Sequence, residues 1–137
     1  MKYRTSGVAS FLVVSLVFIV LGQALAGDES FPLWPVEDYG SGWILGDRNS
    51  DGTTDYALRL DDRGEKKYEA VDHNHDGIMD NFYFYSRGVL ERQEIDTNFD
   101  GNIDLWIFMD DGVHVRGFDR DTNHDGQVDL VRRYGEN

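Results

Sequence analysis

Four nine-residue segments of this chain carry oxygen-bearing side chains at the same spacing. Each has Asp at position 1, Asn at position 3, Asp at position 5, Gly at position 6 and Asp at position 9. They span residues 47–55, 72–80, 96–104 and 121–129, and we call them loops 1 to 4. Oxygens at positions 1, 3, 5 and 9, a backbone carbonyl at position 7 and a sharp turn at the glycine form a pattern by which a short loop wraps a hard cation. The spacing therefore predicts up to four calcium sites.

Every predicted ligand is an oxygen atom, which suits calcium better than a soft or borderline metal. Three carboxylates per loop against a doubly charged ion would leave each occupied site at about −1. Loop 1 is the weakest match, because Arg48 adds a positive charge and Thr54 replaces the apolar residue that the other loops have at position 8. The predicted ligands are the side chains at position 1 (Asp47, Asp72, Asp96, Asp121), position 3 (Asn49, Asn74, Asn98, Asn123), position 5 (Asp51, Asp76, Asp100, Asp125) and position 9 (Asp55, Asp80, Asp104, Asp129), and the carbonyls at position 7 (Thr53, Ile78, Asn102, Gln127).

The segments resemble the DxDxDG calcium loops of EF-hands, dockerins, thrombospondin type 3 repeats and integrin-type β-propellers. The resemblance covers residues 47–129 and departs from the EF-hand at position 12, which an EF-hand fills with a bidentate Glu. A dockerin has Asp at that position. This chain instead has Leu58, Tyr83, Ile107 and Arg132. The resemblance therefore implies DxDxDGxxD loops set between β-strands, as in integrin propellers and bacterial secreted repeat proteins.

The alternative for each segment is a solvated turn, because Asp, Asn and Gly are also common turn residues. Carboxylates at positions 1, 5 and 9 in all four segments favour metal binding over that alternative. Histidines also occur within the loops, at position 2 (His73) and position 4 (His75 and His124). We expect these imidazoles to point away from the ion and toward solvent.

The stretches between the loops are short aromatic and β-branched runs, a composition typical of strands. Each interval between loops is split by a glycine turn, at 61–64, 86–88 and 110–112, so a helix of ten or more residues does not fit. We predict an all-β fold, an antiparallel meander of about eight short strands with four acidic calcium loops at one end. The sequence leaves an open sheet and a closed barrel as alternatives. The expected strands are residues 43–45, 56–60, 66–71, 81–85, 89–95, 105–109, 113–118 and 130–134.

The N-terminus has the features of a signal peptide. Lys2 and Arg4 precede an apolar run over 8–21, and the small residues Ala24 and Ala26 offer a cleavage site. We predict a signal peptide over 1–26, an irregular lead-in over 27–42 and the four-loop β domain over 43–137. After cleavage the protein would have no membrane segment and would be secreted or periplasmic. The alternative is an uncleaved membrane anchor.

The composition argues against several classes of partner and catalyst. The net charge of −13 argues against nucleic acid as a partner, and the absence of cysteine excludes disulfides, Cys-ligated metals and thiol catalysis. No serine lies in a nucleophile-elbow context, so we expect no enzyme activity. The expected function is a calcium-stabilised secreted structural or interaction module. The alternative is a calcium-dependent module for carbohydrate or a cell-surface protein, with a stacking surface from Trp106, Phe108, Tyr83 and Tyr85. The oligomeric state is not predicted.

Overall fold

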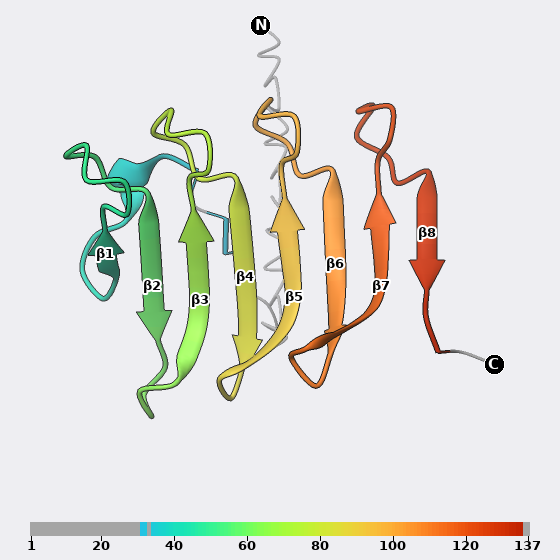
Figure 1. Cartoon of the computed structure of the whole chain (residues 1–137), viewed down its shortest axis with the longest axis horizontal. Coiled ribbons are helices and arrows are strands. Elements are labelled where there is room, and N and C mark those ends of the chain that lie inside the picture. Colours follow the sequence, from blue (N-terminus) through green and yellow to red (C-terminus); the bar gives the residue numbers. More distant parts are fainter. Residues whose placement is uncertain (1–30, 33, 136–137) are drawn as a thin grey trace, which may run out of the picture.

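The computed structural model of this chain describes residues 31, 32 and 34–135, so the predicted signal peptide lies outside the described residues. Eight antiparallel strands form one sheet in chain order (Figure 1), which confirms the all-β meander. The outermost strands, β1 and β8, lie at opposite edges, so the sheet is open and not a barrel. The elements are the 3₁₀ turn η1 (Val36–Asp38) and strands β1 (Ile44–Gly46), β2 (Tyr56–Leu60), β3 (Lys66–Val71), β4 (Asn81–Ser86), β5 (Val89–Ile95), β6 (Leu105–Asp110), β7 (His114–Arg120) and β8 (Leu130–Arg133).

Tight hairpin turns join β2 to β3, β4 to β5 and β6 to β7 at the end of the sheet opposite the loops (Figure 1). In the β4–β5 turn, Arg87 and Gly88 have φ values of 51° and 76°, and two consecutive positive φ values are typical of a type I′ turn. A register shift precedes each turn: after Arg59, after Phe84 and after Phe108. Such bulges increase the local twist of the strand pair. The glycine turns predicted from the sequence therefore close all three hairpins.

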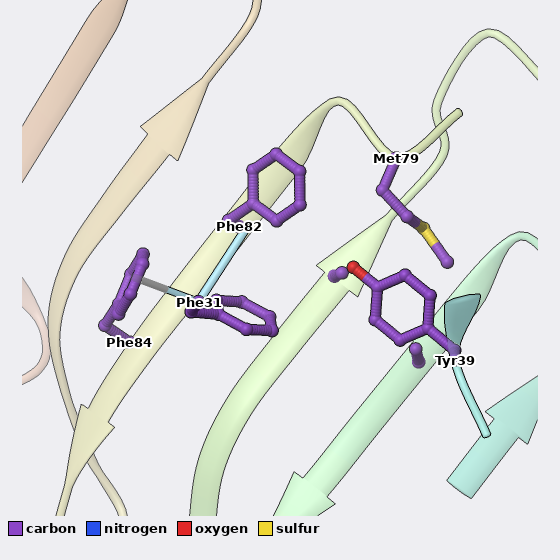
Figure 2. Packing of buried hydrophobic residues seen from close by; sticks show 7 residues of the cluster. Phe31, Tyr39, Met79, Phe82 and Phe84 are labelled. Carbon is purple, nitrogen blue, oxygen red and sulfur yellow. The ribbon is translucent and has the colours of Figure 1, made fainter. Parts of the chain in front are cut away.

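One face of the sheet holds the hydrophobic core. Ala57, Ala70 and Phe82 lie opposite one another on β2, β3 and β4, and all three are fully buried. The lead-in covers them: the Phe31 ring meets Phe82 edge-on at a centroid distance of 5.6 Å (Figure 2), and it also stacks on Tyr68 at 4.5 Å. In its described residues, 31, 32 and 34–42, the lead-in contains η1 but no strand, and it supplies much of the core, which the sequence did not indicate.

The lead-in is also bonded to loop 2. The Val36 amide donates to the Gly77 carbonyl at 3.1 Å, and the Met79 amide donates to the Trp34 carbonyl at 2.7 Å. Met79, at position 8 of loop 2, is fully buried in the core (Figure 2). Loop 2 is therefore anchored to the core through both its backbone and a side chain.

The same face changes character beyond β4. The positions that pair in series with Phe82 are Glu94 on β5, Trp106 on β6 and Asp119 on β7. Here charged residues form ion pairs instead of a core, as between Arg133 Nη1 and Asp119 Oδ1 at 2.6 Å. Among residues 31, 32 and 34–135, the apolar cover therefore extends over only the N-terminal half of the sheet.

The aromatic residues considered for a stacking surface divide between the two faces. Trp106 and Phe108 share the face of Phe82, because the strand register places Phe82, Glu94 and Trp106 in one row. Tyr83 lies on the opposite face, paired with Glu69, and the Tyr85 hydroxyl donates to that same Glu69 at 2.7 Å. These four rings therefore cannot form a single platform.

A close backbone approach at Gly117 gives a first testable prediction. A Cβ at this position would collide with the carbonyl oxygen of Arg132 and lie 2.8 Å from Cδ of Arg133. We expect Gly117→Ala to disturb the β7–β8 pairing and lower the free energy of unfolding by about 1–3 kcal/mol, measured by urea denaturation. The matched control is Gly46→Ala, also in a strand, where the new Cβ would make only ordinary contacts from 3.4 Å to the Tyr56 ring. Equal stability of the two variants would contradict the prediction.

Candidate metal sites at the loop end of the sheet

Loops 1 to 4 lie side by side along one end of the sheet, because the connections β1–β2, β3–β4, β5–β6 and β7–β8 all leave the same end (Figure 1). All twenty predicted ligand residues are in these connections. Backbone hydrogen bonds join position 9 of each loop to position 1 of the next. The bonds run from Asp72 N to Asp55 O (3.0 Å), from Asp96 N to Asp80 O (2.9 Å) and from Asp121 N to Asp104 O (2.9 Å). Acidic residues of neighbouring loops are thereby placed next to each other.

The Asp at position 1 closes each loop. Its Oδ2 atom accepts a hydrogen bond from the glycine amide at position 6, at 2.8, 2.9, 2.7 and 2.7 Å in loops 1 to 4. Glycine is suited to this position because its φ is 86° to 94° in all four loops, a region that L side chains disfavour. Asp72, Asp96 and Asp121 are buried, whereas Asp47 is exposed.

The side chains at positions 3 and 5 form the outer part of each loop. The Asn Oδ1 atom accepts the position-5 amide, the Asn Nδ2 atom donates to the position-5 carboxylate, and that carboxylate accepts the position-7 amide at 2.7 to 2.9 Å. The amide of Thr53 lowers the pKa of Asp51, and the Asn98 side chain does the same for the pKa of Asp100. These carboxylates are exposed and remain anionic at neutral pH.

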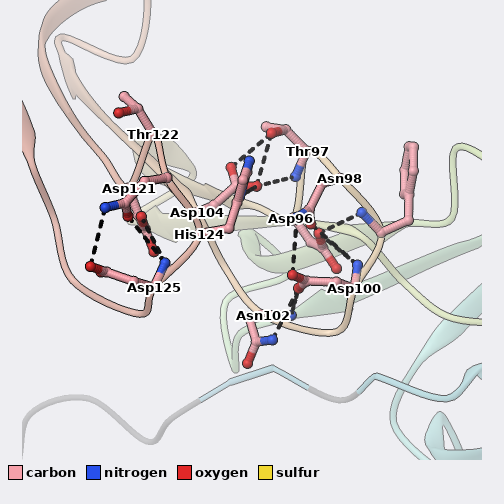
Figure 3. A network of polar contacts seen from close by, with 12 residues as sticks. Asp96, Thr97, Asn98, Asp100, Asn102, Asp104, Asp121, Thr122, His124 and Asp125 are labelled. Atoms are coloured by element: carbon pink, nitrogen blue, oxygen red, sulfur yellow. Dashed lines mark hydrogen bonds and ion pairs between the residues drawn. The ribbon is translucent and has the colours of Figure 1, made fainter.

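The Asp at position 9 caps the start of its own loop. Asp80 accepts the His73 amide at 2.7 Å, and Asp104 accepts both the amide and the hydroxyl of Thr97 (Figure 3). Thr122 does the same for Asp129 in loop 4. Sequence reasoning did not assign a role to these position-2 threonines. Burial raises the pKa of Asp80, so this carboxylate pays a desolvation cost.

Position 8 anchors the loops unequally. Met79 is fully buried in the core and Ile103 packs against it, but Val128 is 45 % exposed. Thr54, the polar substitute in loop 1, is half-buried. The position-7 residues Thr53, Asn102 and Gln127 are exposed, and Ile78 also forms a β-bridge with Pro35. Loop 2 is thus the most firmly held of the four.

The loops offer carboxylate, amide and carbonyl oxygens as possible ligands for a cation. Within residues 31, 32 and 34–135, no three His, Asp or Glu side chains converge on one point as a ready-made metal site. Each loop carboxylate accepts a hydrogen bond from at least one backbone amide of its own loop, and Asp96 accepts three, out of the roughly four acceptor positions that a carboxylate offers. The acceptor positions that these hydrogen bonds leave free are all on oxygen atoms. Arg48 is the only Lys or Arg within the four loops. The chemistry of the donors therefore fits a hard divalent cation, while ligand geometry stays a prediction.

The position-4 histidines, His75 and His124, reach the preceding loop, which the sequence did not indicate. His75 Nδ1 lies 3.1 Å from Asn49 Nδ2 and 3.6 Å from Asp55 Oδ2, so its ring spans from loop 2 to loop 1. His124 Nδ1 lies 3.3 Å from Asp104 Oδ2 of loop 3 (Figure 3). Both imidazoles are partly exposed, as expected, but each also contacts a residue of the preceding loop. A cavity of about 260 Å³ lies beside His75 and one of about 190 Å³ beside His124.

Comparisons of the chain with protein-family models, with curated proteins and with solved structures found no match. In the part of the chain that the structure describes, no helix has the length and apolar character needed to cross a membrane.

Proposed function

We propose that this protein is a calcium-binding, non-catalytic structural or interaction module whose fold is stabilised by calcium and which acts outside the cytoplasm. The observation that carries the proposal is the recurrence of one polar arrangement in four adjacent loops. In each loop the position-1 carboxylate holds the position-6 glycine amide at 2.7 to 2.9 Å, which draws the oxygens of positions 1, 3 and 5 into one tight turn. Four such turns along one sheet end would present four similar oxygen donor sets.

Electrostatics supports the same proposal. The chain has a net charge of −13, and position-9 and position-1 acids of successive loops are neighbours across the strands. Burial raises the pKa of Asp80, and the negative charge of Asp72 adds to this rise, so the two carboxylates of loop 2 repel each other. Two carboxylates about 4 Å apart repel by up to about 4 kcal/mol at an intermediate dielectric. A bound divalent cation would remove much of this repulsion.

Substitutions within loop 2 test the proposal. Asp76→Ala removes a predicted ligand and is expected to reduce the binding stoichiometry by about one calcium per chain. His75→Ala is expected to leave the stoichiometry unchanged, because the imidazole lies against loop 1 and not among the oxygens of its own loop. Isothermal titration of the purified protein with calcium measures both values.

The control is Asp62→Ala, an exposed acid in a hairpin turn at the opposite end of the sheet, which should retain the parent stoichiometry. Absence of calcium binding by the parent protein would refute the proposed function. Equal loss of stoichiometry from His75→Ala and Asp76→Ala would instead indicate a site that uses imidazole.

A further inference from the structure

The position-4 residues distinguish the three boundaries between loops. All four position-4 residues adopt a left-handed backbone, with φ between 58° and 62°. At the boundary of loops 1 and 2 this residue is His75, and at the boundary of loops 3 and 4 it is His124. At the boundary of loops 2 and 3 it is Phe99, which lines a cavity of about 140 Å³ together with Ile78 and Asp80. Two boundaries are thus bridged by polar side chains, and the middle one carries an aromatic ring.

His75 connects predicted ligands of two loops. Its ring lies against Asn49 and Asp55 of loop 1, while its backbone amide donates to Asp72 of its own loop at 2.7 Å. A shift of Asp72 would therefore move the group that contacts Asn49 and Asp55. His124 has the same relation to Asp104 of loop 3, at 3.3 Å. By contrast, the backbone hydrogen bonds between successive loops are alike at all three boundaries and cannot distinguish them.

We infer that the loops act as two coupled pairs, loop 1 with loop 2 and loop 3 with loop 4, so that calcium in one member of a pair raises the affinity of the other. The inference rests on the proposed calcium-binding function. The physical basis is ordering. A cation that fixes the ligands of loop 2 also fixes the His75 ring against loop 1, so binding of a second ion in loop 1 costs less conformational entropy. Loops 2 and 3 fill independently, because Phe99, although it lines the same cavity as Asn74 and Asp76 of loop 2, has no polar side-chain atom to bond their ligands.

Loop-resolved calcium titrations test this pairing. The amides of Gly52, Gly77, Gly101 and Gly126 each report one loop by NMR, because each is bonded to the position-1 Asp of its loop. Asp51→Ala, which disables loop 1, is expected to weaken calcium binding at loop 2 about fivefold, the lower end of typical coupling. The same variant should leave loops 3 and 4 unchanged. Asp100→Ala should weaken loop 4 about fivefold and leave loop 2 unchanged.

Two further sets of variants complete the test: one removes the His75 ring, and the other introduces a histidine at the boundary of loops 2 and 3. In a His75→Ala background, Asp51→Ala should no longer affect loop 2. His75→Gly serves as the second variant, because glycine tolerates the left-handed backbone and separates loss of the ring from strain. His73→Ala, two loop positions before the bridging His75, is the matched control and should preserve coupling. Phe99→His, at a backbone φ of 61° like that of His75, should make loop 3 respond to Asp76→Ala.

The outcomes separate the two proposals. Coupling of equal strength at all three boundaries, coupling that survives loss of the His75 ring, or weaker binding of the second ion in a pair would overturn the pairing but leave calcium binding intact. A parent protein in which none of the four glycine amides responds to calcium would overturn the proposed function itself.

Discussion

Removal of calcium is expected to lower the melting temperature of this protein by about 20 °C or more. If each loop binds with a dissociation constant of about 0.1 mM, one site at about 1 mM calcium contributes about 1.4 kcal/mol, and four sites contribute about 5–6 kcal/mol. A domain of this size has a total stability of about 5–15 kcal/mol. Each kcal/mol shifts the melting temperature by about 4–8 °C. Buried acids such as Asp72 and Asp96 would then remain without a cation.

Thermal unfolding monitored by tryptophan fluorescence, in 1 mM calcium and in EDTA at low ionic strength, measures this effect. A variant that replaces all four position-5 carboxylates by alanine provides the control, and its melting temperature should be the same in both conditions. The four substitutions are Asp51→Ala, Asp76→Ala, Asp100→Ala and Asp125→Ala. An unchanged melting temperature of the parent protein after chelation would show that the loops do not stabilise the fold through calcium.

The second large effect is expected in the core. Phe82 is fully buried on β4, between the Phe31 ring at 5.6 Å and the Trp34 ring at 5.1 Å. Truncation of a buried Phe to Ala typically costs about 3–5 kcal/mol, because the lost contacts leave a cavity. We therefore expect Phe82→Ala to lower the free energy of unfolding by that amount and to loosen the lead-in from the sheet.

Denaturant unfolding at saturating calcium measures this cost independently of the loops. Val113→Ala is the control: Val113 is 74 % exposed in a hairpin turn, so its truncation should change stability by no more than about 0.5 kcal/mol. If Phe82→Ala were as stable as Val113→Ala, the core would not lie where the structure places it.

Much of the sheet could be predicted because its signals are local. Short aromatic and β-branched runs, bounded by glycine turns and acidic loops, predicted the bounds of β2, β3 and β5 as the structure has them. Because side chains alternate along a strand, Phe82 and Tyr83, neighbours on β4, point to different faces. Strand register is set by pairing across the chain, however, so the sequence did not show that Trp106 shares the face of Phe82.

The parts that escaped prediction depend on distant contacts. Phe31, Trp34 and Tyr39 follow neither a strand nor a helix period, so no local pattern linked the lead-in to the core. Within the loops, the spacing indicated which residues carry oxygens, but the position-4 histidines were interpreted as solvent-facing. Their contacts arise only because the meander sets one loop beside the next, as His124 and Asp104 illustrate.

The uneven apolar cover of the sheet affects how easily its strands unfold locally. Opening β4 would expose Phe82 and Phe84 to water, whereas opening β8 would break backbone hydrogen bonds on one side only and uncover little apolar surface. Local unfolding free energy follows the buried apolar contacts of a segment, so it decreases from the N-terminal strands toward the C-terminal edge. The structure is thus graded: β2–β4 share the buried apolar core, and β5–β8 are held mainly by strand pairing and surface ion pairs.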